Sequence, residues 1–446
     1  MTQLAPKMQG PFLARANGPL SGVMRAPADK SISHRALIFG ALAAGETRIT
    51  GLLESGDVLG TANAIAALGA EVEQTGPGAW RVKGVAGRFE TPSAPLDFGN
   101  SGTGARLMMG VVAGSGAGAV FTGDASLSSR PMRRVTDPLQ EMGARLTSNE
   151  GRLPVTLTPS ELHGINYAPP IASAQVKSAI LLAGLGAQGV TTVIEREATR
   201  DHTETMLRAF GASLETRQEG DGMHISLTGP QTLTARDIAV PGDPSSIAFA
   251  LVAALITPGS SIHIAGVMDN PSRTGLITTL REMGADLEIA PGPEMAGERT
   301  MNITASYSRL RGIDVPASRA PSMIDEYPIL GVAAACASGT TRMVGLAELR
   351  AKESDRLAGT AAMLRENGVT VETGEDSLAV VGCGPGGVRG GGRIATHHDH
   401  RLAMSALVLG MTAQQPVSID DAAMIATSYP GFAHDMTALG ARLEQV

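Results

Sequence analysis

The sequence is poor in cysteine, in aromatic residues and in positive charge. Its 446 residues include two Cys, eight Phe, four Tyr and one Trp, and the formal net charge is −7. Cys336 lies in an apolar run and Cys383 in a glycine-rich turn, so we expect no disulfide framework. So few aromatic rings argue against a stacking platform for bases or sugars. The acidic balance argues against a nucleic-acid or polybasic membrane surface.

Long hydrophobic runs are missing as well. No run approaches the roughly 18 apolar residues of a membrane span, and the N-terminal stretch has no apolar signal core. We therefore expect a soluble protein, and the two cysteines without a disulfide framework fit a reducing cytoplasm. A hydrophobic fraction of 43% with 18% charged residues is typical of a globular chain. The length predicts two domains of roughly 200 residues each.

The feature that the sequence has in abundance is repetition. Six times a predicted helix ends on an apolar residue or Asn, followed by Gly, then Ala or Val, then a short strand. The glycines, 68 to 84 residues apart, are Gly69, Gly143, Gly211, Gly284, Gly368 and Gly440. Glycine fits a left-handed helix cap because it has no Cβ to penalise positive φ. The spacing predicts six copies of one α/β unit, each with a buried helix, a strand, a polar loop, an outer helix and a strand.

Each predicted buried helix begins on polar residues. The six openings lie at residues 29–35, 100–103, 173–175, 243–246, 321–325 and 396–401. A helix N-terminus carries unpaired N–H groups and about half a positive elementary charge. Several such ends directed at one place would bind anions without a metal. The repeat therefore predicts an anion-binding site.

Cations recur at these openings and in the polar loops. We interpret one set together as anion ligands, because its members recur at equivalent places in the repeat: Lys30, Arg35, Arg130, Lys352, Arg356 and Arg401. Taken singly, Arg106, Lys177 and Arg273 are interpreted as solvated surface charges, as most such residues are.

Acidic residues occupy the same kind of position. Asp325 opens the fifth buried helix, and Glu353 lies between Lys352 and Arg356. One carboxyl group acting as a base and another acting as an acid would suit proton transfers on a bound anion. The alternatives are equally open from the residues alone: Asp325 would cap the helix, and Glu353 would pair with a neighbouring base.

Two further motifs carry less weight. Gly382–Gly387 matches the GxGxxG pattern but contains Pro385 and is followed by more glycines, so we predict a surface hairpin. The spacing of His397, His398 and His400 does not place all three rings on one helical face. Since no carboxylate or Cys set completes a zinc pattern, no metal site is predicted.

With their neighbours, the helix openings and loops resemble those of 5-enolpyruvylshikimate-3-phosphate synthases (3-phosphoshikimate 1-carboxyvinyltransferases). The matching segments are residues 29–35 (DKSISHR), 99–106 (GNSGTGAR), 129–132 (SRPM), 172–178 (ASAQVKS), 323–328 (MIDEYP), 352–356 (KESDR) and 399–404 (DHRLAM). They span nearly the whole chain. The resemblance is closest to the class II branch, in which glyphosate-tolerant members are known.

The resemblance implies an α/β fold of two similar domains. Each would contain three βαβαββ repeats, in the inside-out α/β barrel of enolpyruvyl transferases, with the active site in the interdomain cleft. We expect residues 23–240 to form the first domain and residues 1–22 plus 241–446 the second. The crossing is placed there because Pro241 and Pro244 interrupt both regular patterns.

The resemblance also implies a reaction. The enolpyruvyl group of phosphoenolpyruvate would pass to the 5-hydroxyl of shikimate 3-phosphate, by addition and elimination through a tetrahedral intermediate, with release of phosphate. This step of aromatic amino-acid biosynthesis uses no metal or organic cofactor. The implied partners are the two substrates, and glyphosate as an inhibitor, without nucleic acid or membrane. A monomer is the family expectation.

Matching positions assign roles to individual residues. Shikimate 3-phosphate would contact Lys30, Ser31, Arg35, Ser173, Ala174, Gln175, Arg200, Asp325 and Lys352. Phosphoenolpyruvate would contact Lys30, Gly102, Arg130, Gln175, Arg356 and Arg401. Asp325 would take the 5-hydroxyl proton, and Glu353, assisted by Lys30, would protonate the methylene carbon.

The chain departs from the family pattern at several positions. Ala28 stands where Gly usually precedes Asp-Lys-Ser, and Thr427 where class I members have a Lys near phosphoenolpyruvate. Arg200 lies about where class I has a Tyr near the shikimate ring. Gly102 stands where tolerant class II enzymes have an Ala, whose methyl group projects into the space that glyphosate needs. We therefore predict an enzyme that is glyphosate-sensitive for its branch.

Two alternative functions compete with this one. The cell-wall enolpyruvyl transferase acting on UDP-N-acetylglucosamine has the same architecture, but its mobile loop usually carries a catalytic Cys or Asp in a pattern that residues 124–130 lack. The other alternative is a non-catalytic scaffold with an anion cleft. Asp325 and Glu353 beside the cations argue against a scaffold, because a binder gains little from acids that face phosphate.

Overall fold

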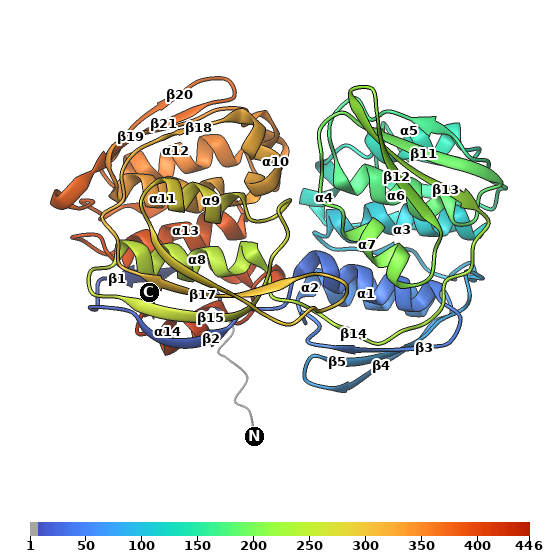
Figure 1. Ribbon diagram of the computed structural model, residues 1–446, viewed down its shortest axis with the longest axis horizontal. Helices are drawn as coiled ribbons and strands as arrows, with labels where there is room; N and C mark the ends of the chain where they lie inside the picture. Colours follow the sequence, from blue (N-terminus) through green and yellow to red (C-terminus); the bar gives the residue numbers. More distant parts are fainter. Residues whose placement is uncertain (1–7) are drawn as a thin grey trace. The chain divides into compact units, whose positions relative to one another are not determined.

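The computed structural model describes residues 8–446, which form two compact units. The N-terminal unit comprises residues 28–241 and 295–298, and the C-terminal unit comprises the described residues up to Pro27, 242–294 and 299–446 (Figure 1). Residues 1–7 of the predicted segment 1–22 lie outside the described residues. The stretch up to Pro27 belongs with the C-terminal unit because β2 (Ser21–Arg25) pairs in parallel with β15 (Ser261–Met268).

The predicted α/β repeat is confirmed, since each unit contains three βαβαββ repeats. The described strands form six four-stranded sheets. In each sheet one neighbouring pair is parallel and the other two pairs are antiparallel. In each repeat, a buried helix follows the first strand and an outer helix follows the second strand.

The first repeat of the N-terminal unit takes its first strand, β14, from the far end of that unit. Repeat by repeat, the elements are β14 (Ile238–Ala239), α1 (Lys30–Leu42), β3 (Glu46–Thr50), α2 (Gly56–Ala67), β4 (Glu71–Gly76) and β5 (Ala79–Lys83); β6 (Leu96–Asp97), α3 (Gly102–Ser115), β7 (Ala119–Thr122), α4 (Ala125–Ser129), α5 (Arg133–Glu141), β8 (Arg145–Asn149) and β9 (Arg152–Thr158); β10 (Asn166–Tyr167), α6 (Ala174–Gly184), β11 (Gly189–Glu195), α7 (His202–Ala209), β12 (Leu214–Glu219) and β13 (Gly222–Gly229).

The C-terminal unit borrows two strands, β1 and β2, from the start of the chain. Repeat by repeat, its elements are β2, α8 (Pro244–Ile256), β15, α9 (Gly275–Glu282), β16 (Asp286–Pro291) and β17 (Thr300–Ser306); β18 (Asp314–Val315), η1 (Ala317–Arg319), α10 (Ala320–Met323), η2 (Ile324–Glu326), α11 (Tyr327–Cys336), β19 (Ser338–Met343), η3 (Ala347–Ala351), α12 (Arg356–Glu366), β20 (Thr370–Thr373), β21 (Leu378–Cys383) and η4 (Gly384–Gly386); β22 (Arg393–Ile394), α13 (His400–Gly410), β23 (Val417–Ile419), η5 (Ala423–Thr427), α14 (Phe432–Ala438), β24 (Arg442–Gln445) and β1 (Phe12–Arg15).

The six cap glycines have the backbone conformation that the sequence pattern predicts. Their φ angles all lie between 83° and 106°. An L side chain is penalised in this region and glycine is not. Each outer helix therefore ends at the same place in its repeat, and the following strand starts two or three residues after the glycine.

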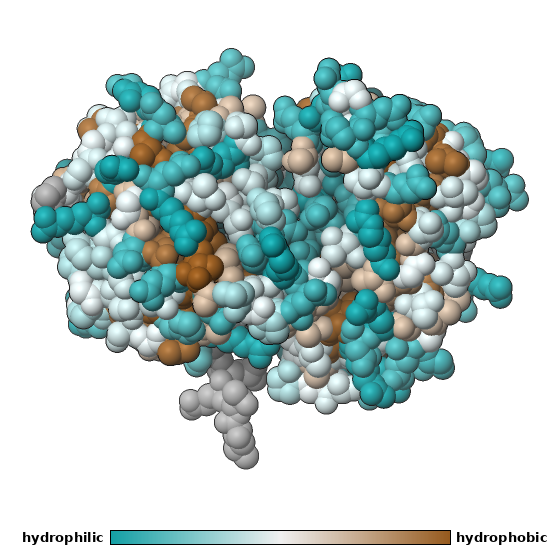
Figure 2. Space-filling model, viewed as in Figure 1, coloured by the Kyte–Doolittle hydropathy of each residue, from teal (hydrophilic) through white to brown (hydrophobic). Residues whose placement is uncertain are grey.

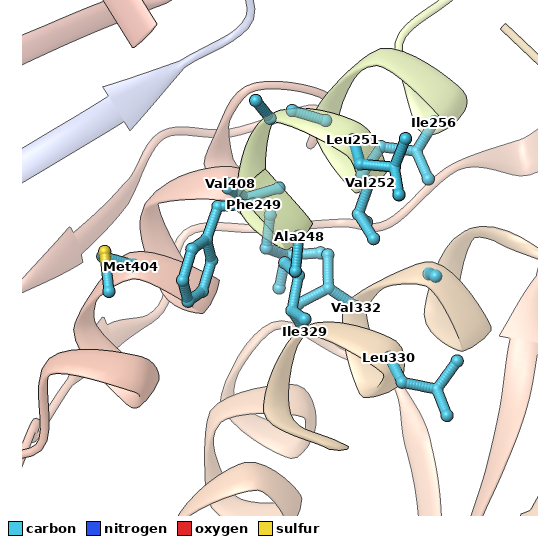
Figure 3. Close-up of a cluster of buried hydrophobic side chains, with 14 of the residues drawn as sticks. Ala248, Phe249, Leu251, Val252, Ile256, Ile329, Leu330, Val332, Met404 and Val408 are labelled. Atoms are coloured by element: carbon cyan, nitrogen blue, oxygen red, sulfur yellow. The ribbon is translucent and has the colours of Figure 1, made fainter. Parts of the chain in front are cut away.

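The helices at the centre of each unit are buried almost all round. In the C-terminal unit, Phe249 and Leu251 of α8, Ile329 and Val332 of α11 and Met404 of α13 belong to one buried cluster (Figure 3). Their sequences carry few polar residues after the first turn, so burial leaves few polar groups to satisfy. The polar chemistry of these helices is therefore confined to their starts.

The predicted hairpin at Gly382–Gly387 is wrong. β21 ends at Cys383 and continues through η4 towards β22, which belongs to a different sheet. The glycines let the chain leave the sheet here: Gly384 and Gly387 have φ of 57° and 70°. The segment is a connection between repeats rather than a turn between paired strands.

The surface seen in Figure 2 is mostly hydrophilic, with separate hydrophobic patches. Large apolar side chains exposed to solvent include Val23 and Val190. Within residues 8–446, no helix combines the length and the apolar character that crossing a membrane requires.

Candidate active site

Polar contacts join the starts of the buried helices in the N-terminal unit. The N-cap side chains of Asp29, Ser101 and Ser173 each accept a hydrogen bond from a backbone N–H in the first turn of α1, α3 or α6. Gln175 Nε2 donates to Thr103 Oγ1 (2.9 Å). Helices α3 and α6 therefore begin side by side.

Arg35 ties α1 to α6 and α7. Its buried guanidinium donates through Nη2 to Ser178 Oγ (2.8 Å), through Nε to Thr203 Oγ1 (2.8 Å) and through Nη1 to the carbonyl of Ser31 (3.2 Å). Three helix N-termini, with their partial positive charges, thus gather around buried cations. We call the starts of α1, α3 and α6, with Arg130 and the loop before α7, the N-terminal half-site.

Lys30 and His34 occupy the first turns of α1. Lys30 forms an ion pair with Asp57, and His34 Nδ1 lies 2.8 Å from Thr61 Oγ1. Burial lowers the pKa of His34 well below its ordinary value, and the charges of Lys30 and Arg35 lower it further. The His34 ring is therefore neutral at neutral pH, and the positive charge of this turn is carried by Lys30 and Arg35.

Gly102 lies against two guanidinium groups. Arg106 Nη1 donates to Gln175 Oε1 (2.7 Å), and Arg130 Nη2 donates to Ser126 Oγ (3.1 Å). A Cβ atom on Gly102 would come within 2.9 Å of Arg106 Nη1 and 3.4 Å of Arg130 Nη1. Even one methyl group here would move Arg106, because 2.9 Å is closer than carbon and nitrogen normally approach without a bond. The glycine keeps the space beside both cations open.

The interpretation of Lys177 as a surface charge is wrong. Its side chain is 1% exposed, and Nζ lies 2.9 Å from Glu195 Oε2 and 2.7 Å from Glu204 Oε1. Burial raises the pKa of Glu204, against the opposing effect of the Lys177 charge. Glu195 ends β11 and Glu204 lies in the first turn of α7, so Lys177 fixes both ends of the loop that carries Arg200.

Arg356 is the centre of a second cluster, in the C-terminal unit. Its guanidinium donates through Nε to Asp399 Oδ2 (2.8 Å), through Nη1 to Asp325 Oδ1 (3.0 Å) and through Nη2 to Glu353. Its side chain is 1% exposed. Burial lowers the pKa of Arg356, but Asp399, Glu353 and Asp325 together raise it above its ordinary value. A permanently charged group therefore holds three carboxylates together.

Asp399 is the structural member of this cluster. It is buried, caps α13 by accepting from the backbone N–H of Arg401 (2.9 Å), and accepts from Ser354 Oγ (3.0 Å). Burial raises the pKa of Asp399, but the Arg356 charge lowers it more, and the pKa lies below its ordinary value. Asp399 thus stays ionised and holds Arg356 in place, which leaves Asp325 and Glu353 as the more accessible carboxylates.

Two further cations surround Asp325. Lys352 Nζ lies 3.7 Å from Asp325 Oδ1. Arg401 Nη1 donates to the Asp325 carbonyl (3.0 Å) and to Glu326 Oε1 (3.2 Å). We call Asp325, Lys352, Glu353, Arg356 and Arg401 the C-terminal half-site.

Arg273 is also not the surface charge that the sequence suggested. It is buried and donates through Nη2 to Asp243 Oδ1 (2.8 Å) and Ser245 Oγ (3.1 Å). Asp243 caps α8, so this pair fastens the loop after β15 to the start of α8. No local signal marks such a pair, since the two residues are thirty positions apart.

The fourteen candidate residues divide between the two units. The N-terminal unit carries Lys30, Ser31, Arg35, Gly102, Arg130, Ser173, Ala174, Gln175 and Arg200. The C-terminal unit carries Asp325, Lys352, Glu353, Arg356 and Arg401. Contacts described above connect all five members of the C-terminal set. Thr427, which the sequence resemblance matched to a class I Lys, ends η5 and donates to the Met424 carbonyl (2.7 Å).

A group that sequence reasoning missed lies at the start of α7. Side-chain atoms of Asp201, His202 and Glu298 that could bind a metal ion all lie within 4.8 Å of one another. His202 and Glu298 are buried, and His202 Nδ1 lies 2.8 Å from Glu298 Oε1. The histidine nitrogen nearest the carboxylate is thus engaged in a hydrogen bond with Glu298.

Comparisons with known proteins give a consistent result. A family profile described as EPSP synthase (3-phosphoshikimate 1-carboxyvinyltransferase) matches residues 14–436. A 3-phosphoshikimate 1-carboxyvinyltransferase of Maricaulis maris is 65% identical over 444 residues, covering 100% of this chain and 99% of the relative. The relative of the same name in Methylorubrum populi is 58% identical over 441 residues, with 97% of both chains covered.

Solved structures of enolpyruvyl transferases support the same family. EPSP synthase from Acinetobacter baumannii superimposes with a TM-score of 0.87 at 42% identity, covering 98% of this chain and 100% of that one. An enolpyruvyl transferase from Streptomyces tendae, at 19% identity, shares the fold with a TM-score of 0.75 over 98% of this chain and 99% of that one. The resemblance seen in the sequence motifs is therefore confirmed, and the chain belongs to the EPSP synthase (3-phosphoshikimate 1-carboxyvinyltransferase) family.

Proposed function

We propose that the two half-sites act on the same two substrates, the N-terminal one chiefly by binding anions and the C-terminal one by moving protons. The protein is an enolpyruvyl transferase of the shikimate pathway. It transfers the enolpyruvyl group of phosphoenolpyruvate to the 5-hydroxyl of shikimate 3-phosphate and releases phosphate.

The proposed contacts with shikimate 3-phosphate begin at the helix starts of the N-terminal half-site. Ser31, Ser173, Ala174 and Gln175 would offer hydroxyl, amide and backbone N–H donors to the phosphate group, next to the positive charges of Lys30 and Arg35. Arg200 would reach the shikimate ring from the loop before α7. Asp325 and Lys352 would contact the hydroxyl that reacts.

Phosphoenolpyruvate carries a phosphate and a carboxylate, so it needs several cations. The proposed ligands are Lys30, Gly102, Arg130, Gln175, Arg356 and Arg401. Gly102 contributes space rather than charge, since its missing Cβ leaves room beside Arg106 and Arg130. Arg356 and Arg401 are held by carboxylates that would share them with the substrate.

The proposed chemistry uses the two accessible carboxylates of the Arg356 cluster. Asp325 takes the proton of the 5-hydroxyl, whose oxygen attacks carbon 2 of phosphoenolpyruvate, while Glu353 with Lys30 delivers a proton to the methylene carbon. In the elimination, the now ionised Glu353 takes a proton back from the methyl group, Asp325 gives its proton to the departing phosphate, and the enol ether forms. No residue changes its net protonation over the full cycle.

The observation that carries this proposal is the contact of Arg356 with both Asp325 and Glu353. One fixed cation sets the distance between the proposed base and acid, which is the positioning that a concerted addition needs.

The direct test measures phosphate release from phosphoenolpyruvate with shikimate 3-phosphate in one tube and UDP-N-acetylglucosamine in another. Release with shikimate 3-phosphate alone is expected. Release with the nucleotide sugar alone would overturn the proposed substrate, and no release in either tube would favour an anion-binding scaffold.

Further proposals concern the molecule as a whole. We propose that it is a cytoplasmic monomer, inhibited by glyphosate, with two domains whose boundaries lie within a few residues of 23–240 and of 1–22 plus 241–446. Sedimentation velocity at two concentrations tests the monomer, and fractionation of cells tests the location. Expression of residues 23–240 alone, followed by unfolding in urea, tests the domain boundary.

A further inference from the structure

A tight turn belongs to the N-terminal unit although the strands that it joins, β16 and β17, belong to the C-terminal unit. Met295 and Glu298 exchange both backbone hydrogen bonds, at 2.9 and 2.8 Å. The two residues between them, Ala296 and Gly297, have φ of 55° and 80°. Positive φ at both central positions characterises a type I′ turn, in which the backbone has little freedom. The turn therefore presents Glu298 in one orientation.

The turn packs on the first turns of α7. A Cβ on Gly297 would lie 3.3 Å from Thr205 Cγ2, so glycine permits the close approach. Glu298 Oε1 lies 2.8 Å from Nδ1 of His202, the first residue of α7, and both side chains are buried. Loss of one partner would leave a buried polar group of the other without this hydrogen bond, which costs more than the loss of a surface contact.

The same stretch of α7 holds the cations of the N-terminal half-site. Thr203, the next residue, accepts from Arg35 Nε (2.8 Å), and Glu204 lies 2.7 Å from Lys177 Nζ. Arg200 lies two residues before His202. A displacement of the start of α7 would therefore be passed to Arg35, Lys177 and Arg200 together.

From these contacts we infer that Glu298 is a positioning residue for shikimate 3-phosphate binding, acting through His202 and the start of α7. The inference rests on the proposed function, in which Arg35 and Arg200 contact that substrate. The role of Glu298 is indirect. Its carboxylate holds the ring of His202 and so the start of α7, and the start of α7 in turn positions Arg35, Lys177 and Arg200. Glu298 is not expected to take part in proton transfer.

The test compares Glu298→Ala and Glu298→Gln with Glu294→Ala, an exposed acid in the same loop that serves as the matched control. Glu298→Ala is expected to raise the KM for shikimate 3-phosphate about tenfold, with kcat and the KM for phosphoenolpyruvate changed less than about threefold. Glu298→Gln keeps an acceptor oxygen for His202 and should recover most of the affinity. Glu294→Ala should match the wild type.

Several outcomes would overturn the inference. One is an unchanged KM for shikimate 3-phosphate in Glu298→Ala; another is an equal loss of affinity for both substrates, which would indicate general disorder. Inactivation of the wild type by a chelator, with recovery on adding Zn²⁺, would indicate a metal site at Asp201, His202 and Glu298 instead. Should Glu298→Ala fail to fold, His202→Gln replaces it in the test. A wild-type KM for shikimate 3-phosphate in His202→Gln would then reject the inference.

Arg35→Lys separates this inference from the proposed function. If Arg35→Lys raises the KM for shikimate 3-phosphate and the Glu298 and His202 variants do not, positioning by Glu298 is rejected while the substrate contact stands. If Arg35→Lys leaves that KM unchanged, the proposed contact itself is wrong, and the inference falls with it.

Discussion

The two half-sites hold their arginines in different ways. In the N-terminal half-site, Arg35 donates to two hydroxyls and a carbonyl oxygen, and Arg130 donates to a hydroxyl and to the amide and carbonyl oxygens of Asn100. In the C-terminal half-site, Arg356 donates to three carboxylates and Arg401 to a fourth. Both arrangements are built on the same repeat, with cations at or near the starts of buried helices.

The difference separates binding from chemistry. An arginine held by neutral oxygens keeps its full charge for an incoming anion, while the hydrogen bonds fix its orientation. An arginine held by carboxylates has less charge to offer, but it holds those carboxylates close together. The comparison predicts that changes in the N-terminal half-site act mainly on affinity and changes in the C-terminal half-site mainly on turnover.

The largest effect is expected from Arg356→Ala, which breaks the C-terminal arrangement. Without the guanidinium, Asp325, Glu353 and Asp399 repel one another, and Asp399 is a buried charge without its main partner. We expect kcat/KM to fall by about a thousandfold and the free energy of unfolding to fall by about 3–5 kcal/mol. Steady-state kinetics and urea unfolding measure the two losses.

The control for this variant is Arg342→Ala. Arg342 forms a 3.7 Å ion pair with Asp314 at the surface of the same unit, with both side chains well exposed. A surface pair contributes about 0–1 kcal/mol, so stability and activity should stay close to the wild type. Equal losses in the two variants would mean that the Arg356 cluster has no special role.

Glu353→Gln tests whether the C-terminal half-site acts on turnover rather than on affinity, because it keeps the shape of the side chain and removes the acid. We expect kcat to fall by about a hundredfold to ten-thousandfold, with little change in either KM. The measurement is single-turnover formation of product by rapid quench, with the exposed Glu372→Gln as control. A raised KM with normal kcat would assign Glu353 to binding.

Gly102→Ala tests the role of open space in the N-terminal half-site. The added methyl group meets Arg106 Nη1 at 2.9 Å and so narrows the space beside the two arginines. We expect the glyphosate concentration for half-inhibition to rise about tenfold, with a smaller rise in the KM for phosphoenolpyruvate and a nearly unchanged kcat.

Gly60→Ala, within α2, is the matched control, since a Cβ there would meet its nearest neighbour, the carbonyl oxygen of Asp97, only at 3.8 Å. Titrating glyphosate against both variants measures whether the loss of sensitivity is specific to Gly102→Ala. Unchanged sensitivity in Gly102→Ala would show that the space beside Gly102 is not used by the inhibitor.

The smallest effect concerns the pH dependence of stability. Native His34 has a pKa well below 6.5 because it is buried near Lys30 and Arg35, whereas in the unfolded chain it takes up a proton near pH 6.5. The unfolded state therefore binds the extra proton, and stability falls as the pH drops below 6.5, by up to about 1.4 kcal/mol per pH unit.

His34→Gln should lose this part of the pH dependence. Urea unfolding at several values between pH 7.5 and about 5.5 would show a shallower decline for the variant than for the wild type. The exposed His434→Gln should decline like the wild type. A wild-type slope in His34→Gln would mean that the ring is already able to protonate in the native state.

Much of the fold could be predicted because its signals are local. The positive φ of Gly69 or Gly440 depends on the residue itself, and the caps at Asp29 and Ser173 join atoms within one helical turn. Repetition of these local signals predicted six α/β units. The hairpin at Gly382–Gly387 was mispredicted for the complementary reason: which strand pairs next is a long-range choice that a glycine-rich turn does not specify.

The candidate site shows the same division between local signals and long-range contacts. The sequence by itself determined the repeat, the helix starts, the family and the residue types that the chemistry requires. Only the tertiary structure decided the partners: that Lys177 is buried between two glutamates, that Arg356 joins three carboxylates, and that Glu298 meets His202 across 96 positions. The physical reason is that a charge is buried or solvated according to the oxygens that packing brings to it, and those oxygens come from segments far away in the chain.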